Sequence, residues 1–100
     1  HGAGTPMDHP QLELLATLLA ARKVRVVRFE FPYMAARRTG ARRPPDREPV
    51  ARAAWHEVIA SLGGGSRVVI GGRSFGGRMA SLVADDEVAD KASSMLERMR

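Results

Sequence analysis

Cysteine is absent from the sequence, and aromatic residues are scarce. Without cysteine the chain can form no disulfide, no zinc–thiolate site and no cysteine nucleophile. One Trp and one Tyr are too few for the row of aromatic side chains on which single-stranded nucleic acid stacks. The unbroken apolar runs are short and no signal-peptide pattern is present, so the sequence predicts no membrane-spanning helix. We expect a cytoplasmic protein.

The residues that are present are typical of a globular domain. Hydrophobic residues make up 44% of the 100 residues and charged residues 27%, which is enough for one modest core. The net charge is +5, with 14 Arg, 2 Lys and 15 Ala, a bias typical of GC-rich coding sequence as much as of a polyanion partner. A nucleic-acid-binding module would rest on charge alone. We therefore expect no specific nucleic-acid partner, no membrane partner, no metal and no cofactor.

Hydrophobic periodicity predicts strands that alternate with helices. A helix over 9–22 carries leucines at helical spacing and is expected to be well buried, with Asp8 as its N-cap and Gln11 completing a capping box. Two strands are predicted, over 24–31 and over 67–70. Between them lie a proline-rich loop over 32–49, with one helical turn around 33–37, and a helix over 50–62. A helix over 78–84 and a terminal helix from residue 88 follow, with Met79, Met95 and Met99 as apolar core or interface residues. This alternation predicts an α/β fold with a parallel sheet.

The most informative segment is a G-x-S-x-G pattern between the second predicted strand and the helix after it. Gly72, Ser74 and Gly76 have the spacing of a nucleophile elbow, where a sharp turn lifts a serine hydroxyl above the sheet and neighbouring side chains would collide. The turn places Ser74 at a helix N-terminus, which favours developing negative charge. It also directs the backbone N–H of Phe75 toward an oxyanion. Ser74 is the candidate nucleophile.

A glycine-rich phosphate-binding turn is the alternative interpretation, because it also occurs between a strand and a helix. Its two sequence patterns do not fit this segment. Gly77 stands where the P-loop pattern needs lysine, and the G-x-G-x-x-G pattern is absent.

A second glycine-rich motif, His1-Gly2-Ala3-Gly4, precedes the first predicted helix. With the G-x-S-x-G segment, it resembles the α/β-hydrolase superfamily, where a His-Gly loop supplies the second oxyanion donor. The blocks HGAGTPMDHP, VVRFEFPYMAARRTGARRPP and VVIGGRSFGGRMASLVAD look like a small bacterial branch of predicted hydrolases related to dienelactone hydrolases. The resemblance implies a three-layer αβα fold and a small acyl substrate. It also implies an oxyanion hole made by the N–H groups of Phe75 and Ala3.

The chain also departs from that family's pattern. No histidine follows His56, whereas the family's triad acid and histidine follow the elbow helix. The family strand that precedes the His-Gly loop is absent, which would leave strand edges unpaired and prone to self-association. We therefore expect a partial fold, with residues 1–87 as the N-terminal part of a hydrolase domain and 88–100 as a helical tail without family counterpart. The alternative to an active enzyme is an inactive truncated fragment.

The remaining polar residues have weaker claims to a role. His1 is expected to orient the His-Gly loop as a hydrogen-bond donor, His9 to be solvated beside a helix cap, and His56 to be partly exposed. None convinces as the catalytic base. Five arginines of the proline-rich loop could attract a carboxylate or phosphate, or simply be solvated, which is the simpler interpretation: Arg37, Arg38, Arg42, Arg43 and Arg47.

Overall fold

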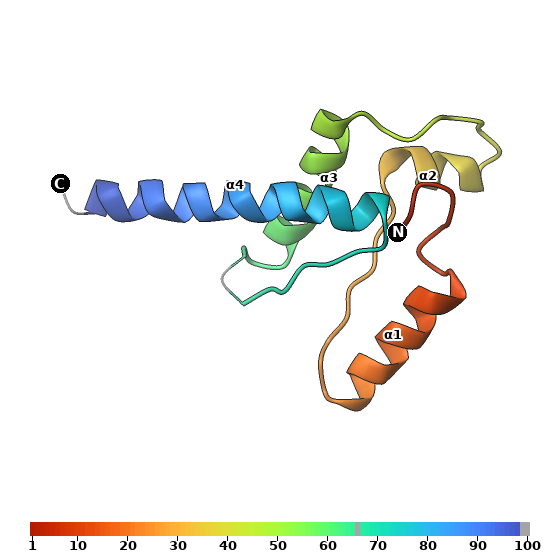
Figure 1. Cartoon of the computed structure of the whole chain (residues 1–100), viewed down its shortest axis with the longest axis horizontal. Coiled ribbons are helices and arrows are strands. Elements are labelled where there is room, and N and C mark those ends of the chain that lie inside the picture. Colours follow the sequence, from red (N-terminus) through yellow and green to blue (C-terminus); the bar gives the residue numbers. More distant parts are fainter. Residues whose placement is uncertain (66, 99–100) are drawn as a thin grey trace.

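The computed structural model describes the backbone of residues 1–65 and 67–98, and the side chains of 1–65 and 67–86. Over this range the chain forms helices joined by extended and turn segments (Figure 1). The helices are α1 (Pro10–Ala21), α2 (Pro32–Arg38), α3 (Glu48–Ser61) and α4 (Phe75–Arg98). Helix α3 packs against α4 and against α2. The predicted helices at 9–22 and 50–62 and the helical turn at 33–37 are confirmed.

The predicted parallel sheet, and with it the three-layer αβα architecture, is wrong for the described residues, which contain no strand. The segments 24–31 and 67–70 hold the β-branched residues that favour strands, but they run as irregular backbone. A strand is stabilised by hydrogen bonds to a neighbour about 4.8 Å away. In the described backbone, no such bond joins these segments to each other or to another extended segment. Strand propensity alone therefore does not produce a sheet here.

The core lies where α2, α3 and the first half of α4 meet. Helix α3 contributes Ala51, Trp55 and Ile59, the face that its helical period predicts. The rings of Phe31 and Phe75 lie 5.2 Å apart and join the segment before α2 to the start of α4. The buried apolar residues are Phe31, Tyr33, Met34, Ala51, Trp55, Ile59, Met79, Ala80 and Val83.

Helix α1 stands apart from this core. Its leucines were expected to be buried, but Leu14, Leu15 and Leu18 are 60%, 52% and 57% exposed, and α1 contacts no other helix of the described chain. The predicted N-cap is also wrong. His9 caps the helix, because its Nδ1 accepts the backbone N–H of Gln11 at 3.2 Å. The chain exposes 7211 Å², against about 5,600 Å² for a compact monomer of this mass.

Helix α4 is longer than the sequence predicts. It continues from Phe75 to Arg98 through Asp85 and Asp86, where a break between two helices was expected. Met79 is buried in the core as expected, whereas the side chains of Met95 and Met99 lie outside the described residues. The domain division between residues 87 and 88 stays a prediction.

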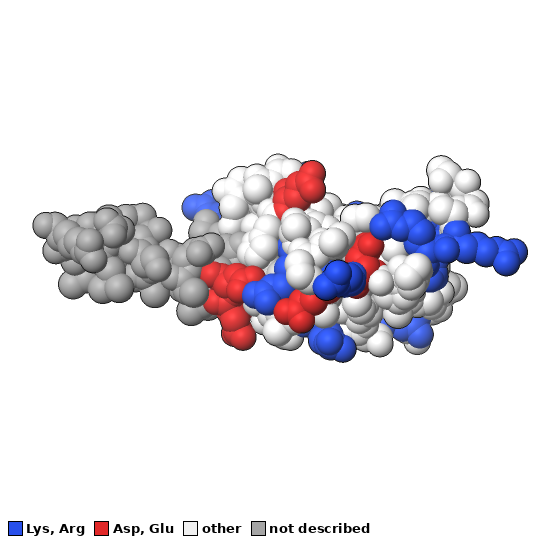
Figure 2. Space-filling view, turned by 90° about the horizontal axis from the view of Figure 1, so that it is seen from above, with Lys and Arg blue, Asp and Glu red and all other residues white. Residues whose placement is uncertain are grey.

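The described helices include none that is both long and apolar enough to cross a bilayer. Charged side chains cover the molecule unevenly. Figure 2 shows acidic and basic side chains intermingled over its middle, and basic ones gathered at the end that carries α2 and the loop after it. That end contains four arginines of the loop region: Arg37, Arg38, Arg42 and Arg43.

Candidate active site

The G-x-S-x-G segment forms a tight turn directly before α4. Ser74 is exposed and has φ +51°, a left-handed conformation that costs a non-glycine residue on the order of 1–3 kcal/mol. The turn is closed by the N–H of Gly76, which donates to the carbonyl of Arg73 at 3.0 Å. Helix α4 begins at the next residue, Phe75. The Ser74 side chain therefore stands at the positive end of a helix dipole.

Glycine is required here because the turn leaves no room for a Cβ atom. A Cβ on Gly72 would lie 2.6 Å from the backbone of Gly76 and Gly77, and a Cβ on Gly77 would lie 2.6 Å from the carbonyl oxygen of Gly72. A Cβ on Gly76 would lie 2.5 Å from the carbonyl oxygen of His1. The sequence pattern singles out Gly72 and Gly76, and the structure adds Gly77. The sequence does signal Gly77, because it directly follows Gly76, but the G-x-S-x-G pattern ends at Gly76 and so leaves it out.

The His-Gly loop lies against this turn although about seventy residues separate the two in sequence. Besides Arg73, the N–H of Gly76 reaches the carbonyl oxygen of His1, at 3.0 Å. A Cβ on Gly2 would come within 4.0 Å of the Ser74 Cβ. In the described structure the backbone N–H groups of Ala3 and Phe75 donate to no protein acceptor. The turn and the His-Gly loop beside it therefore each carry an N–H group without a protein acceptor in the described structure.

A match to a known family accompanies this geometry. The family model described as an alpha/beta hydrolase domain matches residues 1–96. The chain belongs to the α/β-hydrolase domain family. No curated protein and no solved structure matches it at a significant level. The match supports a hydrolase-type function for this domain. It does not test the relation to dienelactone hydrolases.

The imidazole of His1 fixes the His-Gly loop of the hydrolase domain. The ring is buried, its Nδ1 lies 2.7 Å from the carbonyl oxygen of Gly2, and its Nε2 accepts the backbone N–H of Phe31 at 2.9 Å. A ring that donates from Nδ1 and accepts at Nε2 is neutral. Both nitrogens of His1 are engaged, which fits the orienting donor expected from the sequence.

Tyr33 is a second anchor of this loop, and the sequence analysis missed it. Its side chain is fully buried, and its hydroxyl donates to the carbonyl oxygen of Ala3 at 2.8 Å. Burial raises the pKa of the phenol, which keeps it protonated. The carboxylate of Asp46 accepts the backbone N–H of Tyr33 at 2.9 Å and so caps the start of α2. A lone aromatic residue after a proline gives no sign of this contact in sequence.

An ion-pair cluster holds the far end of the same loop. Glu30 accepts from two nitrogens of Arg38, at 2.6 and 2.7 Å, and from the backbone N–H of Met7 at 3.2 Å. Arg38 also pairs with Asp8 at 3.0 Å. The guanidinium lowers the pKa of both carboxyl groups. Asp8 thus binds Arg38 instead of capping α1.

In the described structure, neither of the other two histidines is hydrogen-bonded to the serine hydroxyl. His9 is half-buried rather than solvated, and Nη1 of Arg73 lies 3.0 Å from each of its ring nitrogens. His56, partly exposed as expected, has its Nε2 at 3.1 Å from Asp86. Asp86 lies twelve residues along α4 from Ser74, roughly 18 Å. Within the described structure, Ser74 Oγ has no hydrogen-bond partner.

Proposed function

We propose that this chain carries the nucleophile of a serine hydrolase that acts on an ester or related small acyl compound. The observation that carries the proposal is Ser74, exposed and strained at φ +51° at the start of a 24-residue helix. A nucleophile elbow likewise presents a strained, exposed serine at the turn that leads into a helix. Membership in the α/β-hydrolase family supports the same chemistry.

In this proposal Ser74 Oγ attacks the acyl carbon of the substrate. The carbonyl oxygen becomes an oxyanion that accepts hydrogen bonds from the N–H groups of Phe75 and Ala3, each worth about 3 kcal/mol in the transition state. Collapse of the tetrahedral intermediate breaks the bond to the leaving group, which departs with a proton, and leaves an acyl group on Ser74. Water then hydrolyses this ester and restores the hydroxyl. The glycines at 72 and 76 allow the turn that presents Oγ.

The attack also needs a base that removes the serine proton. In the part of the chain that the structure describes, no imidazole is hydrogen-bonded to Ser74, and His1 has both nitrogens engaged. We therefore expect the 100-residue chain to hydrolyse acyl substrates slowly. The alternative function, an inactive truncated hydrolase, predicts that neither the chain nor the full product of its gene hydrolyses acyl substrates efficiently.

Labelling with a fluorophosphonate probe separates these cases, because the probe reacts with activated serines. The full gene product is compared with its Ser74→Ala and Ser81→Ala variants. Ser81 is a matched control because it is exposed on α4, the helix that follows Ser74, and its hydroxyl donates to the carbonyl of Arg78 at 2.7 Å. We expect labelling that is lost only in Ser74→Ala. A folded, unlabelled gene product would contradict the proposed hydrolase and favour the inactive alternative.

A further inference from the structure

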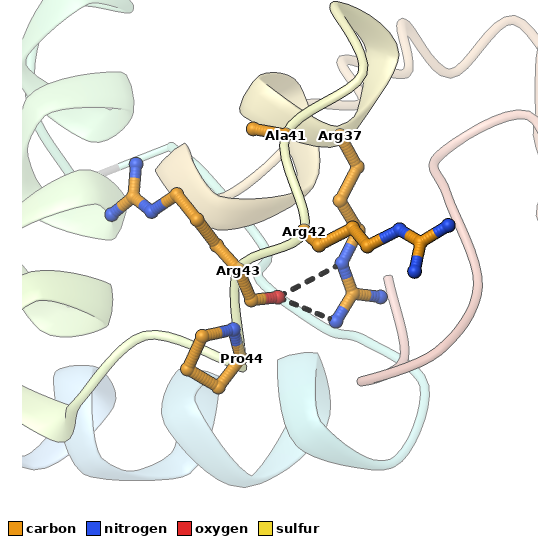
Figure 3. A pocket seen from close by; sticks show the side chains of 5 residues that line it. All are labelled: Arg37, Ala41, Arg42, Arg43 and Pro44. Carbon is orange, nitrogen blue, oxygen red and sulfur yellow. Dashed lines mark hydrogen bonds between the residues drawn. The ribbon is translucent and has the colours of Figure 1, made fainter.

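The end of α2 and the loop after it form a pocket that the proposed catalytic step does not use. Its volume is about 400 Å³, and it is lined by Arg37, Ala41, Arg42, Arg43 and Pro44 (Figure 3). Three of the five lining residues are cationic. The question is whether these arginines are simply solvated or arranged to receive an anion.

Arg37 is held in place. Its Nε and Nη2 donate to the carbonyl oxygen of Arg43 at 3.1 and 2.8 Å, and its guanidinium lies over the ring of Tyr33 at 5.0 Å. These contacts leave Nη1 without a protein partner in the described structure. A fixed guanidinium loses less conformational entropy when it binds a ligand than a solvated one does. Arg37 is therefore pre-organised as a donor.

Arg42 adds a second positive charge on the same side. Figure 3 shows the guanidinium groups of Arg37 and Arg42 on one side of the 41–44 segment and that of Arg43 on the other. The nearby carboxylate of Asp46 is committed to Arg43, at 3.4 Å, and to the N–H of Tyr33. Across the described residues neither Arg37 nor Arg42 forms an ion pair. Two guanidinium groups therefore share one pocket without a counter-charge.

The pocket is connected to the candidate active site through one side chain. The Tyr33 ring packs under Arg37, and the Tyr33 hydroxyl binds the carbonyl of Ala3 in the His-Gly loop. The width of one tyrosine side chain thus separates the guanidinium from the loop that holds a candidate oxyanion donor.

We propose that Arg37 and Arg42 bind an oxyanion group, carboxylate or phosphate, carried by the acyl substrate. That the bound anion belongs to a substrate rests on the proposed hydrolase function, whereas the anion site itself does not depend on it. Arginine suits this role because its planar N–H donors match both groups and it stays charged at any physiological pH. The site would select anionic acyl compounds over neutral ones.

Titration of the ¹⁵N-labelled chain with inorganic phosphate and, separately, with succinate tests the site by NMR at constant ionic strength. We expect saturable shifts of the Arg37 and Arg42 Nε–H signals and of the amides of 37–46. Arg42→Gln should weaken binding by at least about tenfold, as loss of a hydrogen bond to a charged group does. Arg22→Gln is the matched control, because it removes the same charge from an exposed arginine that directly follows α1.

Unchanged binding in Arg22→Gln together with the loss in Arg42→Gln would support the site, and the tighter probe would identify the group as phosphate or carboxylate. Shifts that do not saturate, or equal weakening by both variants, would overturn it in favour of general attraction to a basic surface. The readout does not involve Ser74. Failed serine labelling with intact anion binding would therefore overturn the hydrolase function alone.

Discussion

Replacement of Gly72 by alanine tests whether steric closeness fixes the turn before α4. The new Cβ would lie 2.6 Å from the carbonyl carbon of Gly76 and from the nitrogen of Gly77, whereas ordinary contacts begin at 3.4 Å. The start of α4 would have to move by about 0.8 Å, the difference between these distances. The colliding atoms are backbone atoms, so no side-chain rotation relieves the contact.

The expected cost follows from measured effects of overpacking. Forcing extra atoms into a packed site destabilises a protein by about 1–3 kcal/mol. Replacing glycine also restricts the unfolded chain, which returns about 0.4–1 kcal/mol. We expect Gly72→Ala to lower the free energy of unfolding by about 1–2 kcal/mol. Urea unfolding followed by the fluorescence of Trp55, which lies in the core, measures it.

Gly71→Ala is the matched control. A Cβ on Gly71 would meet no heavy atom within 4 Å, and Gly71 does not have a positive φ. Its substitution should therefore leave stability unchanged or raise it by up to about 1 kcal/mol. If the two variants unfold at the same urea concentration, the close approach of Gly72 to α4 does not fix the turn, and the steric argument is refuted.

Three further substitutions test the contacts around the His-Gly loop. Arg38 holds the pKa of Glu30 below its ordinary value of 4.5, so the ion pair stabilises the fold above about that pH and is lost as the pH falls through the lowered pKa. Glu30→Gln should therefore reduce stability at pH 7 and weaken the fall in melting temperature toward acid pH. If the melting temperature falls as steeply in the variant as in the wild type, the ion pair does not stabilise the fold. Tyr33→Phe removes the hydroxyl that binds the carbonyl of Ala3 and should cost about 1 kcal/mol in urea unfolding, whereas wild-type stability would show that this bond contributes nothing. Asp46→Ala removes the acceptor of the Tyr33 N–H and should cost about 1 kcal/mol by the same measurement, with Asp46→Asn, which keeps an acceptor oxygen, as the milder control.

The sequence predicts helices and the turn well because both depend on local chemistry. The period of Ala51, Trp55 and Ile59 predicts the buried face of α3, and these residues are buried. The glycine spacing predicts a sharp turn at the serine, and Ser74 lies in a tight turn with a positive φ. The roles of the serine and of the oxyanion donors stay predictions.

The sheet and the long-range polar contacts could not be predicted in the same way. Val24 and Val27 favour a strand, but a strand requires a hydrogen-bonded neighbour, which local sequence does not supply. The leucines of α1 have helical spacing, yet nothing in that period says whether another surface covers them. The contact of Tyr33 with Ala3 spans 30 residues. No periodicity or motif encodes such a pairing.

The left-handed backbone at Ser74 also limits which residues can replace it. A β-branched side chain is a genuine outlier at positive φ, so threonine would offer the same hydroxyl at a steric disadvantage from its extra methyl group. Cysteine exchanges oxygen for sulfur without branching and fits the same backbone. At position 74 the backbone therefore favours replacement of serine by cysteine, which changes the reacting atom, over replacement by threonine, which keeps the hydroxyl.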